Sequence, residues 1–269
     1  MRECGMLLPV ASLPSRYGIG AFSKEAYDFI DTLKAAGQSW WQILPLGPTG
    51  FGDSPYQSFS AFAGNPYFID LEKLTEEGLL TKEECRDVDF GSNERDIDYK
   101  KIYDGRFPLL RKAYERWKDG RAAEQVHGLA VQKLGHETRE YCFYMAVKNH
   151  FDSCSWNLWD EGIRLRKPEA LEAYRAKLTD EIGFYEFQQM KFEEQWDALK
   201  GYAHEQGIRI IGDIPIYVAF DSADSWSHPE LFQFDGNNMP GAVAGCPPDG
   251  FSATGQLWGN PLYNWEYHR

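Results

Sequence analysis

Residues 208–218 have the sequence IRIIGDIPIYV, and this stretch decides the fold class. A nearly continuous isoleucine run is typical of a strand buried on both faces of a parallel sheet. Asp213 interrupts the run, and a carboxylate in such a place is costly to bury unless it is paired, hydrogen-bonded or used. At the carboxyl end of a strand it would belong to an active site. We predict a functional Asp213; the alternative is an aspartate that caps the following turn.

Two more apolar stretches, residues 5–13 (GMLLPVASL) and 40–46 (WWQILPL), predict further buried strands. Between them, Ser23 is a candidate N-cap, apolar residues recur at i, i+3, i+4 and i+7 from Ala26, and Gly37 occupies a C′ position. A strand, an amphipathic helix and a second short apolar strand predict a parallel βαβ unit.

The middle of the chain differs in character. From Thr75 to about Thr179 the sequence is charged and predicts helices, one of which begins at Pro168. Residues 184–189 are apolar and aromatic, and we predict a helix after them that ends at Gly207. The chain therefore predicts an α-rich insertion within a parallel α/β fold.

Residues 244–265 have the sequence AGCPPDGFSATGQLWGNPLYNW, dense in glycine, proline and aromatic residues. This composition predicts a rigid loop with little strand or helix periodicity. Flat rings next to amides and a carboxylate are typical of a wall of a sugar-binding cleft. The alternative, a loop that packs its aromatic side chains onto the core, stays open at this point.

Composition excludes several classes. The net charge of −13 over 269 residues disfavours nucleic acid and anionic membranes as partners. We find no membrane-spanning apolar run and no secretory signal. Five scattered cysteines predict a reducing cytoplasm, with neither disulfides nor a zinc site. The histidines lack metal-ligand spacing, and a carboxylate at Asp53 argues against a phosphate loop at 47–54, so we predict no metal and no cofactor.

Asp213 and Asp249 together could form a carboxylate pair for glycoside chemistry, with one as acid and the other as nucleophile or base. The sequence does not give their separation, and acidic residues are abundant.

Four motifs carry a resemblance to a known family: SLPSRYGIG (12–20), WWQILPLGPTGFGDSPYQSFSAFAGNPYFIDL (40–71), IIGDIPIYVAFDSADSW (210–226) and the 244–265 stretch. They strongly resemble the bacterial 4-α-glucanotransferases, the amylomaltase or disproportionating-enzyme family. The resemblance covers essentially the whole chain, and such long motifs are highly specific.

The resemblance implies the N-terminal part of a (β/α)₈ barrel, with about three barrel strands and an α-rich inserted subdomain. The expected divisions are residues 1–55 for the first barrel units, 56–183 for the helical insertion, 184–220 for the third strand region and 221–269 for a substrate loop. The implied activity is transfer of an α-1,4-glucan segment to the 4-hydroxyl of an acceptor through a covalent intermediate, with retention. The implied partners are α-1,4-glucans and maltooligosaccharides, in cytoplasmic glycogen, starch or maltodextrin metabolism.

Matched to the family's motifs, Ser54 and Tyr56 are expected on the donor side of the cleft, and Asp213 near the cleavage point. A flexible loop on the acceptor side is expected to contribute Asp249, Phe251, Gln256 and Trp258.

The match has one departure. The family's nucleophilic aspartate lies in a motif like RIDHFRG on the next strand, and its acid/base glutamate lies further on; we expect both beyond Arg269. This chain is therefore predicted to be inactive alone, and its open sheet to be an aggregation liability. The alternatives are a non-catalytic α-glucan-binding module and a hydrolase that uses only Asp213 and Asp249.

Overall fold

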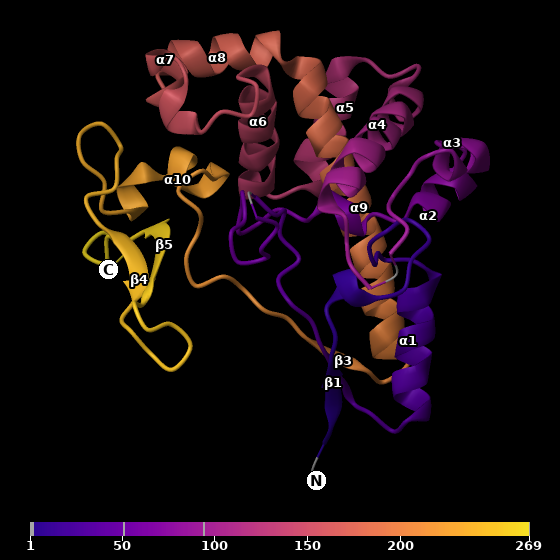
Figure 1. Cartoon of the computed structure of the whole chain (residues 1–269). Coiled ribbons are helices and arrows are strands. Elements are labelled where there is room, and N and C mark those ends of the chain that lie inside the picture. The colour runs from indigo at the N-terminus through magenta and orange to yellow at the C-terminus, as the bar shows by residue number, and fades with distance from the viewer. Residues whose placement is uncertain (1–2, 51, 94, 269) are drawn as a thin grey trace. The chain divides into compact units, whose positions relative to one another are not determined.

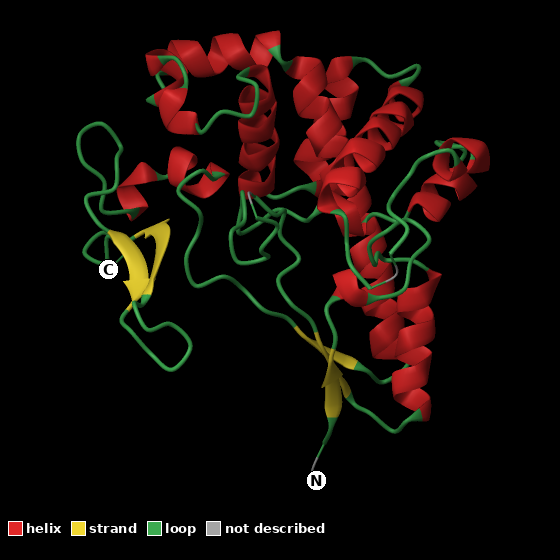
Figure 2. Ribbon diagram, in the orientation of Figure 1, coloured by secondary structure: helices red, strands yellow, loops and turns green. Residues whose placement is uncertain are grey.

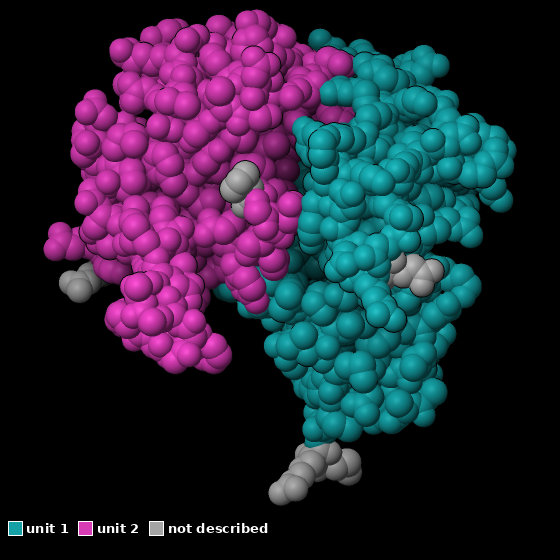
Figure 3. Space-filling view, in the orientation of Figure 1, with its two compact units in different colours: residues 1–46, 64–134, 186–214 teal, residues 47–63, 135–185, 215–269 magenta. Residues whose placement is uncertain are grey.

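The computed structural model describes residues 3–50, 52–93 and 95–268. The chain forms two compact units, each built from three separate stretches (Figure 3). Unit 1 contains Met1–Leu46, Gly64–Leu134 and Glu186–Ile214, and unit 2 contains Gly47–Ala63, Gly135–Tyr185 and Pro215–Arg269. Each unit combines stretches that are far apart in sequence, so neither unit corresponds to a single continuous segment. The divisions after residues 55, 183 and 220 stay a prediction.

Unit 1 contains a parallel sheet of β1 (Gly5–Leu7), β2 (Trp40–Gln42) and β3 (Arg209–Ile211), in the order β1-β2-β3. Figure 1 labels β1 and β3 of this sheet. The register pairs Met6 with Trp41 and Trp41 with Ile210. Trp41 is fully buried and anchors the sheet. The predicted parallel βαβ unit is confirmed.

The strands are much shorter than the apolar runs predict. After β1 the chain turns into a 3₁₀ helix at Val10–Ser12, and beyond β3 the residues Ile214 and Ile216 are 79% and 81% exposed. The physical reason is the number of partners: within the described residues, β1 and β3 each pair on one side only, with β2. Pro215, which has no amide hydrogen, cannot extend the ladder. The predicted parallel strand is confirmed at Arg209–Ile211, but the prediction that it is buried and extends over 208–218 was wrong.

Helix α1 (Lys24–Ala35) begins and ends as predicted, with Ser23 at the N-cap position and Gly37 at a φ of +68°. The Ser23 hydroxyl makes no capping bond to the helix backbone and donates to the Glu25 carboxylate instead. Helix α9 (Thr179–Glu205) is longer than predicted, because the apolar stretch at 184–189 is part of the helix rather than a segment before it. The two helices lie side by side in unit 1 (Figure 2). The ring centroids of Tyr27 and Tyr202 are 5.1 Å apart.

The other helices of unit 1 are α2 (Leu71–Glu76), α3 (Lys82–Arg86), α4 (Tyr99–Lys118) and α5 (Ala123–Lys133), with a 3₁₀ turn at Pro66–Phe68. Helix α4 buries a charged group, Arg106, which donates to the carbonyl of Ile69; burial lowers the pKa of its guanidinium to about 10.

Unit 2 contains α6 (His136–His150), α7 (Glu161–Arg164), α8 (Pro168–Lys177) and α10 (Ala223–Ser227), with 3₁₀ turns at Trp156–Leu158 and Pro229–Leu231. Pro168 begins α8, as predicted. The unit also contains strands β4 (Val243–Cys246) and β5 (Gln256–Pro261). Among the described residues, no helix is long and apolar enough to cross a membrane.

Candidate functional site

Most of the aromatic stretch at 244–265 lies in a β-hairpin that spans residues 243–261. Strands β4 and β5 pair antiparallel, with Gly245 opposite Leu257 and Cys246 opposite Gln256. The prediction of an irregular loop was therefore wrong for its two arms. The sequence does not show the alternation of apolar and polar residues that is typical of a strand. The reason is that β4 contains a bulge between Val243 and Gly245, and β5 contains Gly259 at a positive φ.

The tip of the hairpin, residues 247–255, is shaped by its own polar groups. The Asp249 carboxylate accepts hydrogen bonds from the amides of Phe251 and Ser252, both at 2.8 Å, and the Ser252 hydroxyl donates to the carbonyl of Gly255 at 2.7 Å. Gly255 has a φ of +75°, and a Cβ there would lie 2.5 Å from the carbonyl oxygen of Cys246. Asp249 therefore organises the turn.

The hairpin presents aromatic rings to solvent. Phe251 at the tip is 100% exposed, and Trp258 in β5 is 44% exposed. The Trp258 indole donates to the side-chain oxygen of Gln256 at 3.0 Å, and its ring lies 6.5 Å from that of Tyr217. The core-packing alternative for these two rings does not describe the structure.

Ser54 and Tyr56 lie in a turn of the Gly47–Ala63 loop. The amide of Tyr56 donates to the Ser54 hydroxyl at 3.3 Å, and that of Gln57 to the Ser54 carbonyl at 3.1 Å. The loop closes on itself through the Thr49–Ser58 bridge and the bond from the Gly50 amide to the Gln57 carbonyl. The Tyr56 ring is exposed.

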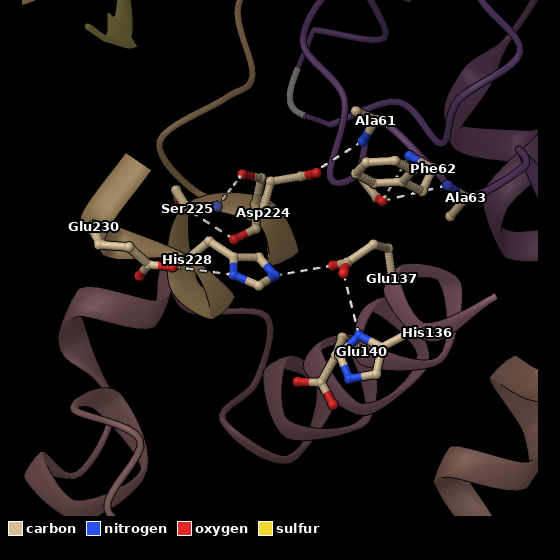
Figure 4. Close-up of polar contacts among 12 residues, drawn as sticks. Ala61, Phe62, Ala63, His136, Glu137, Glu140, Asp224, Ser225, His228 and Glu230 are labelled. Carbon is tan, nitrogen blue, oxygen red and sulfur yellow. Dashed lines mark hydrogen bonds and ion pairs between the residues drawn. The ribbon is translucent and has the colours of Figure 1, made fainter. Parts of the chain in front are cut away.

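Helix α10 holds this loop through backbone and side-chain bonds (Figure 4). The carboxylate of Asp224 accepts the Ala61 amide at 3.1 Å, and the Ala223 amide donates to the Phe59 carbonyl at 2.8 Å. Burial raises the pKa of Asp224 to about 6. Close by, His228 contacts Glu137 of α6 through Nε2 at 3.0 Å.

A second carboxylate anchors the 215–222 segment, which leads into α10. Asp221 accepts hydrogen bonds from the Tyr144 hydroxyl at 2.6 Å, the Lys148 ammonium at 2.5 Å and the Trp156 amide at 3.2 Å. Lys148 is buried, and its charge is balanced by this pairing.

Asp213 belongs to unit 1, shortly after the end of β3, whereas the other six predicted contact residues all belong to unit 2. Its side chain is half-buried, so it does not sit inside a buried strand as predicted. Its position directly after a parallel strand agrees with the expectation for a strand-end carboxylate. The described residues include no group of three or more histidines, cysteines or acidic residues that could hold a metal ion.

The comparisons with known proteins agree with this architecture. The model of the 4-alpha-glucanotransferase family, glycoside hydrolase family 77, matches residues 8–269. The chain belongs to the 4-α-glucanotransferase family.

Individual family members are close relatives. The 4-alpha-glucanotransferase of Streptococcus pneumoniae is 50% identical over 98% of this chain, and that of Thermus thermophilus is 46% identical over 98%. The chain spans about half the length of the curated relatives it matches, 52% in both of these cases.

Solved structures of the family confirm the predicted fold class. An amylomaltase from Streptococcus agalactiae in complex with acarbose matches the whole chain and 54% of its own, with a TM-score of 0.94 and 45% identity. The amylomaltase from Corynebacterium glutamicum, at 21% identity and a TM-score of 0.70, shares the fold over 97% of this chain and 36% of its own. The three-stranded parallel sheet with its helical insertion is consistent with the N-terminal part of a (β/α)₈ barrel.

The family motifs led to the exposed rings but missed what holds them. Gln57 follows the SPY motif, and Asn260 lies in β5; their side-chain amides are 3.1 Å apart, although the residues are 203 positions apart in sequence. Tyr217, which contacts Trp258, was also missed. Sequence periodicity reports only local neighbours, so nothing in it signals this pairing.

Proposed function

We propose that this chain is the glucan-binding N-terminal part of a retaining 4-α-glucanotransferase. The observation that carries the proposal is the match of the whole chain, at a TM-score of 0.94, to an amylomaltase whose structure contains acarbose. The proposed ligands are α-1,4-glucans and maltooligosaccharides, and the proposed setting is cytoplasmic maltodextrin, starch or glycogen metabolism.

Within this proposal, two surfaces of unit 2 bind different parts of the glucan: the turn at Ser54 and Tyr56, and the hairpin. Ser54 and Tyr56 contact the donor segment, and the hairpin residues Gln256 and Trp258 contact the acceptor. A sugar ring has one apolar face, and the exposed rings of Tyr56 and Trp258 offer flat apolar surface to cover it. Asp249 acts indirectly, because its carboxylate is already engaged with the amides of the hairpin tip.

Glucan transfer also requires two catalytic carboxylates, which we do not assign to any of the residues above. A retaining enzyme uses one carboxylate as nucleophile and another as acid/base, and we propose that both follow Arg269 in the complete enzyme. Asp213 hydrogen-bonds sugar hydroxyls near the cleavage point. The acceptor must compete with water, and a well-oriented group reaches an effective molarity of about 10⁵ M or more. Phe251 and Trp258 support transfer by holding the acceptor and covering the site from water.

The 269-residue protein tests the proposal directly. We expect retardation in a gel that contains soluble starch, and no glucose or longer oligosaccharides after incubation with maltotriose. The Trp258→Ala variant should lose most of the retardation. Trp265→Ala, which removes another exposed tryptophan of unit 2 outside the hairpin, should keep it.

Each outcome distinguishes the alternatives. Migration unaffected by starch would refute glucan binding. Glucose without longer products would support a hydrolase that uses Asp213 and Asp249, and both kinds of product would show that the chain is active alone. Binding without turnover agrees with the proposal and equally with a non-catalytic α-glucan-binding module; turnover by a longer protein that continues into the family's nucleophile motif would favour the enzyme.

A further inference from the structure

Three segments of unit 2 meet at the side chain of Asn260. This residue lies in β5 and is only 4% exposed. Its Nδ2 donates to the carbonyl of Val218 at 2.8 Å, and its Oδ1 accepts from Nε2 of Gln57 at 3.1 Å. A longer bond of 3.5 Å runs from Nδ2 back to Oε1 of Gln57. Both hydrogens and the oxygen of this buried amide are therefore used.

The segments joined at Asn260 are those that carry the proposed glucan contacts. Gln57 is next to Tyr56 in the Gly47–Ala63 loop, and Asn260 lies two positions after Trp258. Val218 follows Tyr217, whose ring contacts that of Trp258. One amide thus connects the loop of the donor side, the hairpin of the acceptor side and the 215–222 segment.

We propose that Asn260 is a positioning residue that holds these surfaces in fixed register, so that a glucan long enough to touch both binds to a preorganised site. This inference deepens the proposed function and rests on it. A ligand that contacts both surfaces avoids the entropy cost of ordering them, whereas a short sugar that contacts one gains nothing from the connection. A residue that served only general stability would affect both ligands alike.

The chemistry of an amide suggests a selective test, the Asn260→Asp variant. As a carboxylate, the new side chain still accepts from Gln57 but turns a lone pair toward the Val218 carbonyl, which loses its donor. When protonated, it can donate to Val218 and accept from Gln57, as asparagine does. Burial raises the pKa of such a carboxyl group, so acid should restore the connection.

We expect Asn260→Asp to weaken maltoheptaose binding about ten-fold at pH 7.5, within the usual range for coupling between sites, and to recover most of it at pH 5. Maltose affinity should stay within about two-fold at both pH values. Titration calorimetry measures both. The matched control is Asn264→Asp, since Asn264 also donates to a backbone carbonyl, that of Glu230, but not to the joined segments. Wild type and control account for the titration of other groups in unit 2, including Asp224.

A second measurement needs no ligand. At pH 7.5, Asn260→Asp should accelerate amide hydrogen exchange in β5, in residues 215–222 and at Gly50 and Phe59, whose amides close the Gly47–Ala63 loop. Helix α6 and the control variant should be unaffected. Faster exchange in β5 alone would overturn the proposal, as would equal losses of maltose and maltoheptaose affinity or no recovery in acid. If the wild type binds no maltoheptaose, the proposed function fails, and the exchange experiment still decides whether Asn260 joins the segments.

Discussion

Two regions of unit 2 contain the same kinds of side chain and use them in opposite ways. Around α6 and α10, Trp156 and Trp226 are 0% and 1% exposed, and the Trp226 ring lies 5.5 to 5.9 Å from those of Trp159, Phe143 and Tyr144. On the hairpin, Phe251 is 100% exposed and Trp258 is 44% exposed.

The difference shows that aromatic content alone says nothing about ligand binding. The buried rings contribute stability through packing and lost water contact. We expect the exposed rings to contribute little to stability, because hydrogen bonds of the backbone and of polar side chains shape the hairpin that carries them. Variants of the two regions can therefore be told apart by measuring both the free energy of unfolding and the affinity for a glucan.

Replacing a buried ring should have the largest effect. Trp226→Ala removes the ring contacts of α10 with α6 and the hydrogen bond from its indole to the Ile163 carbonyl at 3.1 Å. We expect the free energy of unfolding to fall by about 3–5 kcal/mol. Urea denaturation followed by circular dichroism measures the change. Trp265→Ala, an exposed tryptophan of the same unit, should change it by less than about 0.5 kcal/mol. Similar losses of unfolding free energy in the two variants would show that buried and exposed rings of unit 2 do not differ in their contribution to stability.

Features with local causes could be predicted from the sequence. The N-cap at Ser23, the left-handed Gly37 and the first turn at Pro168 depend on a few adjacent residues and were found where expected. The parallel order of the sheet followed from apolar runs separated by a helix. Local sequence patterns and the resemblance to a known family were therefore enough to predict the fold class.

Features that depend on distant partners could not be predicted. The length of β3 is limited by what pairs with it, which an isoleucine run does not reveal. The hairpin was hidden because Gly245 and Gly259 break the alternation of its strands. Which tryptophans are buried, and that Gln57 meets Asn260, follow only from the three-dimensional contacts. Local pattern thus located the candidate rings but not the groups that hold them.

A buried and an exposed carboxylate of unit 2, Asp224 and Asp235, should also differ in how they make stability depend on pH. Burial raises the pKa of Asp224, which holds the Gly47–Ala63 loop, from an ordinary 3.8 to about 6, whereas backbone amides of Met239 and Asn237 lower that of the exposed Asp235. Between about pH 4 and 6 the folded state therefore holds more protons at Asp224 than the unfolded state does, and this contribution to stability falls as the pH rises. At Asp235 the sign is opposite: its contribution is present above the ordinary pKa and is lost as the pH falls through the lowered value.

Urea midpoints of the wild type and of Asp224→Asn and Asp235→Asn, measured at several pH values, test these signs. Relative to Asp224→Asn, the wild type should lose stability from pH 4 to 6 and then level off. Relative to Asp235→Asn, it should gain stability as the pH rises from the acid range. Parallel curves for the wild type and Asp224→Asn would mean that burial does not perturb Asp224.

The smallest effect on stability should come from the most exposed ring. Phe251→Ala removes a side chain outside the core, while Asp249 and Ser252 still hold the tip through bonds that do not involve the ring. The free energy of unfolding should change by less than about 0.5 kcal/mol. Maltoheptaose affinity should fall about five-fold, because covering part of a ring contributes on the order of 1 kcal/mol. Tyr267→Ala, an exposed ring outside the hairpin, should leave the affinity unchanged. Loss of stability without loss of binding at Phe251 would assign the hairpin the same packing role as the buried rings, and the distinction between the two regions would disappear.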